Sequence, residues 1–175
     1  IGAFNQPNFV LIDIDFINTL EREELLSGLG EVVKYAYLTN PNFHRYVKNN
    51  IQPVLNKNPK VFTRIINESV RFKGDVVISD EKESGNRKML NLGHTFAHAF
   101  EVETKFKLKH GQAVIVGIAS ALFLSYKLGL IEQSKLDELL ELIYLFKEEI
   151  KVSKVNFENA ISIMQRDKKN SAGKI

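Results

Sequence analysis

The chain has 175 residues, of which 44% are hydrophobic and 26% charged, which fits a globular domain with its own core. It has no cysteine, so disulfides and thiolate metal sites are excluded, and a transition metal would need His, Asp, Glu or water as ligands. The net charge of +3 comes from 24 basic and 21 acidic residues that are intermixed along the chain, which disfavours nucleic acid and suits a small anionic partner.

The first predicted element is a strand over residues 8–15, where Phe9 and Leu11 belong to an apolar run typical of a buried strand. A single strand has no partner with which to pair. We therefore expect a larger domain upstream, with residues 1–18 forming the junction to it.

From residue 19 onward the apolar spacing is helical, and the first helix stops at Asn40-Pro41. The polar, glycine-containing run 79–88 predicts a loop or short hairpin. The expected fold class is mainly α, with residues 19–175 forming one helical domain. Further helices are expected over 42–50, 60–77, 90–102, 111–128, 133–149 and 157–165.

Targeting and membrane signals are lacking in the sequence. Apolar stretches such as 113–123 are shorter than a bilayer span, and no charged segment followed by an apolar one opens the chain. We expect a cytoplasmic protein that binds neither membranes nor nucleic acid.

Three of the four histidines suggest a metal site. His94 and His98 are four residues apart, so a helix would place both rings on one face. An isolated pair of this kind also fits two exposed or core histidines, and no Glu follows His94, so the HExxH zinc-protease pattern is absent. His110 precedes a long apolar helix, where its ring can project into a cleft.

Glu31 is the candidate carboxylate for such a site, because it lies within the otherwise apolar and small-residue stretch 26–35. Joined to two histidines, it would form a His₂Glu site with an open coordination position, the usual layout of catalytic zinc. The alternative is a solvent-facing pair of Glu31 with Lys34. Gly28 and Gly30 each lower helix propensity by roughly 1 kcal/mol relative to Ala, so we expect close approach of backbone or ligand to account for them.

Six segments occur in a recognisable order and spacing. They are Ile1-Gly-Ala-Phe-x-Gln-Pro7, Gly28-Leu-Gly-Glu-Val-Val-Lys34-Tyr, Lys73 with Asp80-Glu81, Arg87-x-x-Leu-Asn-Leu-Gly-His94-Thr-Phe-Ala-His98-Ala-x-Glu101, His110-Gly-Gln-Ala-Val, and Asp167-Lys-Lys169. Together they resemble the C-terminal part of the 3-dehydroquinate synthases, over nearly the whole chain. The resemblance implies a multihelical metal- and substrate-binding domain whose NAD-binding α/β partner domain is missing from the chain.

That family uses zinc and NAD in the shikimate pathway to convert 3-deoxy-D-arabino-heptulosonate 7-phosphate to 3-dehydroquinate and phosphate. The resemblance implies transient oxidation, phosphate elimination, reduction and aldol cyclisation, carried out by a homodimer in the full-length enzyme. The chain alone is expected to be inactive, because the main site for NAD lies outside it.

The resemblance also implies residue roles. Glu31, His94 and His110 become the ligands of Zn²⁺ or another divalent ion such as Co²⁺, and His98 becomes a proton-handling or supporting residue. The residues implied in catalysis and substrate binding are Lys34, Lys73, Arg87, Asn91, His98, Lys168 and Lys169, with one of the last two facing the substrate. The positions implied near NAD are Phe16, Thr19 and Leu20, of which Phe16 and Leu20 fit a core equally well.

Three positions depart from the family pattern: Gly30 replaces Ala, Ala97 replaces Gly, and Gln112 replaces a common Glu. The first two exchanges should only adjust packing, whereas Gln112 puts in doubt a supporting carboxylate at that position. Related cyclases that make deoxy-scyllo-inosose or valiolone skeletons remain alternatives. The basic residues argue against a glycerol-dehydrogenase-like enzyme, since a neutral polyol needs no such cluster. A non-catalytic helical module with a closed four-ligand zinc site is the alternative from another class.

Overall fold

The computed structural model describes residues 7–81, 85–152 and 155–166. Over these residues the chain is helical and contains no strand, which confirms the mainly α class. The elements are the 3-10 helices η1 (Ile14–Thr19) and η2 (Asn86–Asn91) and the α-helices α1 (Arg22–Leu38), α2 (Pro41–Asn49), α3 (Ile51–Leu55), α4 (Pro59–Ser79), α5 (His94–Glu103), α6 (His110–Lys127), α7 (Gln133–Tyr144) and α8 (Phe157–Gln165).

Two Asn-Pro pairs set the starts of α2 and α4. The Asn40 side chain accepts hydrogen bonds from the backbone N–H groups of the first turn of α2, and Asn58 does the same for α4. In each case proline occupies the first helical position, where its missing N–H and fixed φ cost nothing. The predicted stop at Asn40-Pro41 is therefore confirmed.

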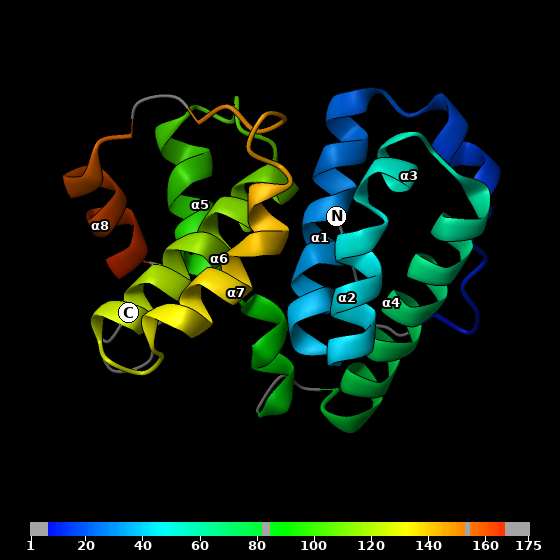
Figure 1. Cartoon of the computed structure of the whole chain (residues 1–175), viewed down its shortest axis with the longest axis horizontal. Coiled ribbons are helices and arrows are strands. Elements are labelled where there is room, and N and C mark those ends of the chain that lie inside the picture. The colour runs from blue at the N-terminus through cyan, green and yellow to red at the C-terminus, as the bar shows by residue number, and fades with distance from the viewer. Residues whose placement is uncertain (1–6, 82–84, 153–154, 167–175) are drawn as a thin grey trace.

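The helices form two groups that meet along α1 and α6 (Figure 1). Helices α2, α3 and α4 pack on α1, and this group lies on the right in Figure 1. Helices α5 and α7 pack on α6, and α8 packs on α5, to form the group on the left. The contact between α1 and α6 therefore joins segments more than 70 positions apart in the sequence.

The main core follows this contact. Leu29 and Val33 of α1 pack in one cluster with Val114 and Ile118 of α6, and all four are buried. Because α6 contacts three other helices, its apolar residues extend around most of its surface. No helix in the described part of the chain is both long and apolar enough to cross a membrane.

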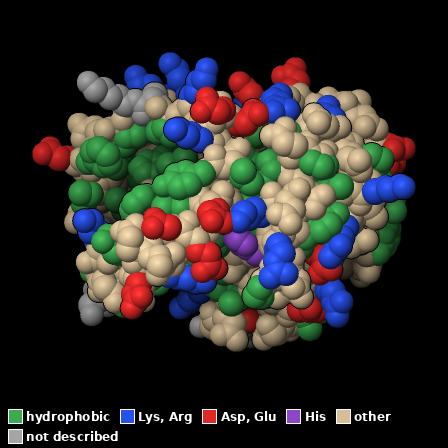
Figure 2. Space-filling view, viewed as in Figure 1, with side chains coloured by type: hydrophobic (Ala, Val, Ile, Leu, Met, Phe, Trp, Pro, Cys, Tyr) green, Lys and Arg blue, Asp and Glu red, His purple; other side chains and the backbone are tan. Residues whose placement is uncertain are grey.

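The surface carries both signs of charge in close alternation, as Figure 2 shows. The same face is hollowed and hydrophobic over the group formed by α5 to α8. Phe123 and Leu124 of α6 and Tyr144 of α7 are among the exposed apolar side chains of this group.

Residues 8–15 differ from the expected strand. Residues 8–13 have no regular structure, and η1 begins at Ile14, where the Asp13 side chain accepts a hydrogen bond from the Asp15 N–H. The described residues offer this segment no partner strand, so the inter-strand hydrogen bonds of a sheet cannot form there. Its apolar side chains are largely exposed, with Phe9 at 82% and Leu11 at 86%.

The remaining differences are local. Helix α7 ends at Tyr144, and turns occupy 145–149, which were expected to continue the helix. The short helix α3 was not expected because Pro53 looked like a boundary, but the residue lies in the first turn, where proline is tolerated. Within the run 79–88, Ser79 ends α4 and Asn86 begins η2, so the predicted loop is confirmed only for the described residues between them. Asp80 Oδ2 closes this loop by accepting from the N–H groups of Gly85 and Arg87.

Candidate metal centre

Glu31, His94 and His110 lie together although they come from three helices. Glu31 lies in the middle of α1, and the two histidines are the first residues of α5 and α6. One ligand atom of each lies within 4.8 Å of the others. Glu31 Oε1 is 3.5 Å from His94 Nε2 and 3.6 Å from His110 Nε2.

A close crossing of α1 and α6 places Glu31 beside His110. A Cβ on Gly30 would lie 2.1 Å from the Gly111 carbonyl oxygen, and one on Gly111 would lie 1.7 Å from that of Ser27. The two backbones can approach this closely only because neither position has a side chain. Each glycine neighbours a candidate ligand in the sequence, so the crossing itself brings these ligands together.

This crossing explains Gly30 but not Gly28, which is exposed and where an added Cβ would meet no atom within 4 Å. It also shows that the exchange of Ala for Gly at position 30 is more than a small packing adjustment. An alanine there would force α1 and α6 to separate.

A second crossing places His94. Gly93 precedes α5 in the left-handed region, with φ of +77°, and a Cβ on Gly117 of α6 would lie 2.2 Å from the Gly93 carbonyl oxygen. The start of α5 is thus held against α6, and this contact brings His94 close to His110. The centroids of the two rings are 5.3 Å apart.

Hydrogen bonding fixes which nitrogen of His94 faces Glu31. His94 Nδ1 lies 3.1 Å from the Leu92 carbonyl oxygen, which can only accept, so a neutral ring carries its proton on Nδ1. The lone pair of Nε2 then points toward Glu31 Oε1. A metal-ligating histidine commonly has this arrangement, with its other nitrogen donating to a carbonyl or carboxylate.

The donor set fits a cation. Glu31 Oε1 is buried and has no hydrogen-bond partner among the described residues, which is costly for a carboxylate oxygen. The ligands of a tetrahedral zinc, with bonds of about 2.1 Å, lie about 3.4 Å apart. The distances of 3.5 and 3.6 Å from Glu31 to the two histidines are close to that value.

Lys34 lies on the other side of the Glu31 carboxylate. Its Nζ donates to Glu31 Oε2 at 2.6 Å, so the predicted pair forms, but the Lys34 side chain is only 4% exposed. The alternative of a solvated pair is therefore wrong for the lysine. By binding Oε2, Lys34 leaves Oε1 to face the histidines. Burial, and after it the charge of Glu31, raises the pKa of the neighbouring Tyr35 to about 12, so this phenol stays neutral.

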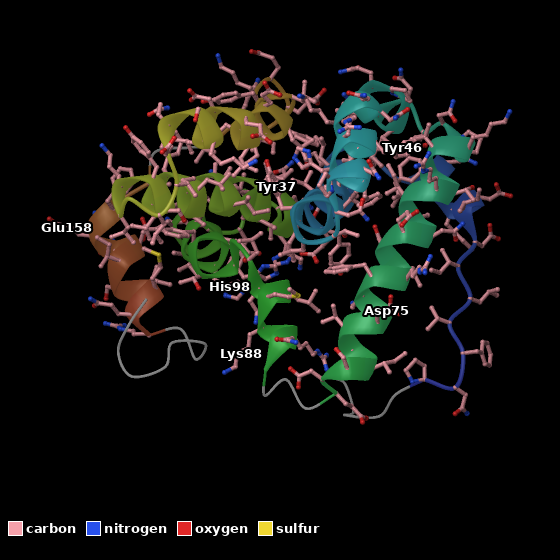
Figure 3. The ribbon with its side chains drawn as sticks, turned by 60° about the horizontal axis from the view of Figure 1, so that its bottom comes forward. Tyr37, Tyr46, Asp75, Lys88, His98 and Glu158 are labelled. Carbon is pink, nitrogen blue, oxygen red and sulfur yellow. The ribbon has the colours of Figure 1, made fainter. Side chains whose placement is uncertain are left out.

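His98 lies beside the centre but is not one of the three converging ligands. Its ring centroid is 5.8 Å from that of His94 and 6.4 Å from that of His110. Figure 3 shows His98 of α5 and Lys88 of η2 on the lower side of that view, with Tyr37 above them.

The other predicted substrate residues lie on neighbouring elements. Arg87 and Asn91 belong to η2, which contacts both α1 and α4, and Lys73 is exposed on α4. Arg87 is half-buried, and its Nη1 donates to the Glu81 carbonyl oxygen at 2.8 Å. Lys168 and Lys169 lie outside the described residues.

The positions proposed near NAD lie at η1, which packs on α4. Phe16 is 73% exposed and Leu20 is 40% exposed, so the alternative that they are core residues is wrong for this chain. The Thr19 hydroxyl donates to the Phe16 carbonyl oxygen.

Sequence reasoning gave Glu101 no role, yet its Oε1 lies 3.3 Å from His110 Nδ1. The available signal was its spacing, since Glu101 follows His94 by seven residues on one helix and so shares its face. Gln112 does not take this place, because its Oε1 accepts from the Lys109 N–H at the start of α6.

A separate cavity of about 350 Å³ lies between α1, α2 and α7. Tyr37, His44 and Lys48 line it together with residues of α7, and none of the three converging ligands does. Burial lowers the pKa of His44, with a smaller contribution from Lys48.

The fold and the centre define a helical domain with two imidazoles and one carboxylate arranged for a divalent metal. Residues 28–170 match the family described as 3-dehydroquinate synthase C-terminal. The chain belongs to this family.

Individual relatives of the chain bear the name of the same family. The 3-dehydroquinate synthase of Dictyoglomus turgidum is 40% identical over 176 residues, which are 100% of this chain and 49% of the relative. The chloroplastic 3-dehydroquinate synthase of Solanum lycopersicum is 41% identical over 177 residues, covering 100% of the chain and 40% of the relative. The chain thus spans about half the length of the first of these relatives, and less of the second.

A solved structure shares the fold. The 2-epi-5-epi-valiolone synthase ValA of Streptomyces hygroscopicus subsp. jinggangensis 5008, with NAD⁺ and Zn²⁺ bound, superposes with a TM-score of 0.73 at 19% identity. The match covers 87% of this chain and 43% of that one.

Proposed function

We propose that this chain is the metal- and substrate-binding part of a 3-dehydroquinate synthase. The reaction converts 3-deoxy-D-arabino-heptulosonate 7-phosphate to 3-dehydroquinate and phosphate, with Zn²⁺ and NAD as cofactors. Residues 19–175 would form this part and residues 1–18 its junction with an NAD-binding domain. The observation that carries the proposal is the convergence of Glu31, His94 and His110.

The cofactors bound in one solved structure of the same fold add support. The valiolone synthase that shares the fold carries NAD⁺ and Zn²⁺. In this chain, Zn²⁺ held by Glu31 and two neutral imidazoles would keep an open position and act there as a Lewis acid toward a substrate oxygen. NAD would supply the hydride acceptor and donor, with Phe16, Thr19 and Leu20 approaching it.

The remaining residues suit a substrate with a carboxylate and a phosphate. Arg87 offers a planar fork for two oxygens of one anion, and Lys73 offers an exposed point charge. Lys34 is already committed to Glu31, so its role would be to orient that carboxylate at the edge of the substrate site. Asn91 would hydrogen-bond the substrate, and one of Lys168 and Lys169 would complete the basic set.

His98 would move a proton near the ligands. Its ring lies close to both His94 and His110, and an imidazole has one nitrogen that can accept a proton and one that can donate it. A histidine in this position can take a proton from a substrate group without leaving the metal centre short of a ligand.

Metal content separates ligands from their neighbour. We expect Glu31→Ala, His94→Ala and His110→Ala to lose zinc after dialysis. His98→Ala should keep zinc but lower the rate of turnover, measured in the protein at its natural length. Elemental analysis of the four variants decides the assignment, and loss of zinc from His98→Ala would contradict it.

The reaction itself is tested by phosphate release. The protein at its natural length, given the heptulosonate phosphate and NAD, should release phosphate and form dehydroquinate. Release only from another sugar phosphate would favour a related cyclase. Stoichiometric zinc in a site with a fourth protein ligand and no turnover would favour the structural module.

Two expectations about the whole protein remain predictions. We propose a homodimer, which light scattering of the protein at natural length would test. We also propose a cytoplasmic location, although the tomato relative is described as chloroplastic, and imaging of a tagged protein would test it.

A further inference from the structure

Glu101 of α5 contacts the ring nitrogen of His110 that faces away from Glu31. Its Oε1 lies 3.3 Å from His110 Nδ1. The Glu101 side chain is 15% exposed, whereas that of His110 is 45% exposed. A largely buried acceptor therefore holds a ring that its own packing leaves half in solvent.

The contact selects one tautomer of His110. A carboxylate oxygen only accepts hydrogen bonds, so the neutral ring must carry its proton on Nδ1. The lone pair of Nε2 then faces Glu31 Oε1, at 3.6 Å. The same state is imposed on His94 by the Leu92 carbonyl oxygen, so two different acceptors give both rings the same orientation of lone pairs.

We propose that Glu101 is a positioning residue that keeps His110 in the Nδ1–H tautomer and aims its Nε2 at the point shared with Glu31 and His94. The purpose of this contact rests on the proposed metal centre. The negative charge of Glu101 also makes the imidazole a stronger donor to a cation.

The carboxylate beside His110 comes from α5, and not from position 112, which lies close to the histidine on α6. Gln112, which replaces the Glu common in the family, is buried and turned toward the start of its own helix, where its Oε1 accepts from the Lys109 N–H at 3.2 Å. The loss of a carboxylate at position 112 thus leaves the carboxylate–histidine contact of His110 intact.

Zinc affinity gives the first test, measured by competition with a chromophoric chelator. Glu101→Ala should weaken binding about 10–100-fold. Glu101→Gln keeps an acceptor oxygen but no charge, so it should recover part of that loss. Glu103→Gln is the matched control, because Glu103 lies on the same helix and contacts the Asn156 N–H instead of a histidine. The control should bind zinc as the parent does.

The ¹⁵N shifts of the His110 ring give a second readout that does not depend on zinc. At pH 8 in the metal-free chain, the parent and Glu101→Gln should show Nδ1–H, whereas Glu101→Ala should shift the ring toward Nε2–H. An unchanged tautomer in Glu101→Ala overturns the proposal, and so does an equal loss of zinc affinity in Glu103→Gln.

These readouts separate two failures. If the parent chain binds no zinc but Glu101→Ala changes the tautomer, the metal centre fails and the positioning contact stands. If the parent binds zinc and Glu101→Ala changes neither affinity nor tautomer, the metal centre stands and the positioning role is wrong.

Discussion

Gly111→Ala should damage the metal centre without changing any ligand. A Cβ at Gly111 would lie 1.7 Å from the Ser27 carbonyl oxygen and 2.6 Å from its carbonyl carbon. Both are backbone atoms of α1, so no rotamer change relieves the overlap. Since an ordinary carbon–oxygen contact is about 3.3 Å, α6 must move by roughly 1.5 Å.

The size of the effect follows from this displacement. Overpacking of a core contact costs about 1–3 kcal/mol of unfolding free energy. Metal–ligand distances tolerate about 0.2 Å, so moving His110 by several times that amount from Glu31 should weaken zinc binding about 100-fold. Gly28→Ala is the matched control, because it is exposed on α1 with open space around it. It should raise stability by about 0.5–1 kcal/mol and leave zinc affinity unchanged.

Urea unfolding of the metal-free chains gives the stability change, and chelator competition gives the zinc affinity. If Gly111→Ala binds zinc as tightly as the parent, the crossing does not set the geometry of the centre. If Gly28→Ala lowers zinc affinity as much as Gly111→Ala does, a change in the helix propensity of α1 explains the loss and close approach does not.

Three further predictions concern stability. Burial holds the pKa of His44 below its usual value of 6.5, so the folded chain binds fewer protons than the unfolded chain in mild acid. The free energy of unfolding should therefore fall as pH drops below 6.5. Urea titrations at several pH values measure this dependence, which His44→Asn should flatten. Phe146→Ala removes a side chain that is 1% exposed and should cost about 3–5 kcal/mol, whereas Phe157→Ala, at 74% exposed, should cost under about 0.5 kcal/mol; equal losses would contradict the assignment of the core. The buried Thr104 hydroxyl accepts from a loop N–H, so Thr104→Val should cost about 1–3 kcal/mol by calorimetry, and the exposed Thr63→Val should cost far less.

The helices could be predicted because their signals are local. The Asn-Pro pairs at 40–41 and 58–59 each supply a cap and a first residue suited to a helix start, and the structure uses both. The strand over 8–15 could not be judged in this way. A strand depends on a partner for its hydrogen bonds, and apolar alternation carries no information about whether that partner is present.

Local spacing gave an incomplete account of the metal centre. The interval between His94 and His98 correctly places the two rings near each other, with centroids 5.8 Å apart. It cannot reveal that Glu31 and His110 meet His94 from two other helices. That information came from the resemblance. The structure supports it through the distances from Glu31 to the two histidines, which cannot be calculated from the spacing of residues along one helix.

The glycines of α1 show why the contacts between helices could not be predicted from the sequence. Gly28 and Gly30 carry the same cost in a helix, and the sequence offered one explanation for both. Only Gly30 faces the backbone of α6, because close approach depends on the partner helix. The separation of α1 and α6 therefore sets the distance from Glu31 to His110. A substitution that changes the first must change the second. Stability and metal affinity should accordingly vary together at Gly30 and Gly111, and independently at Gly28.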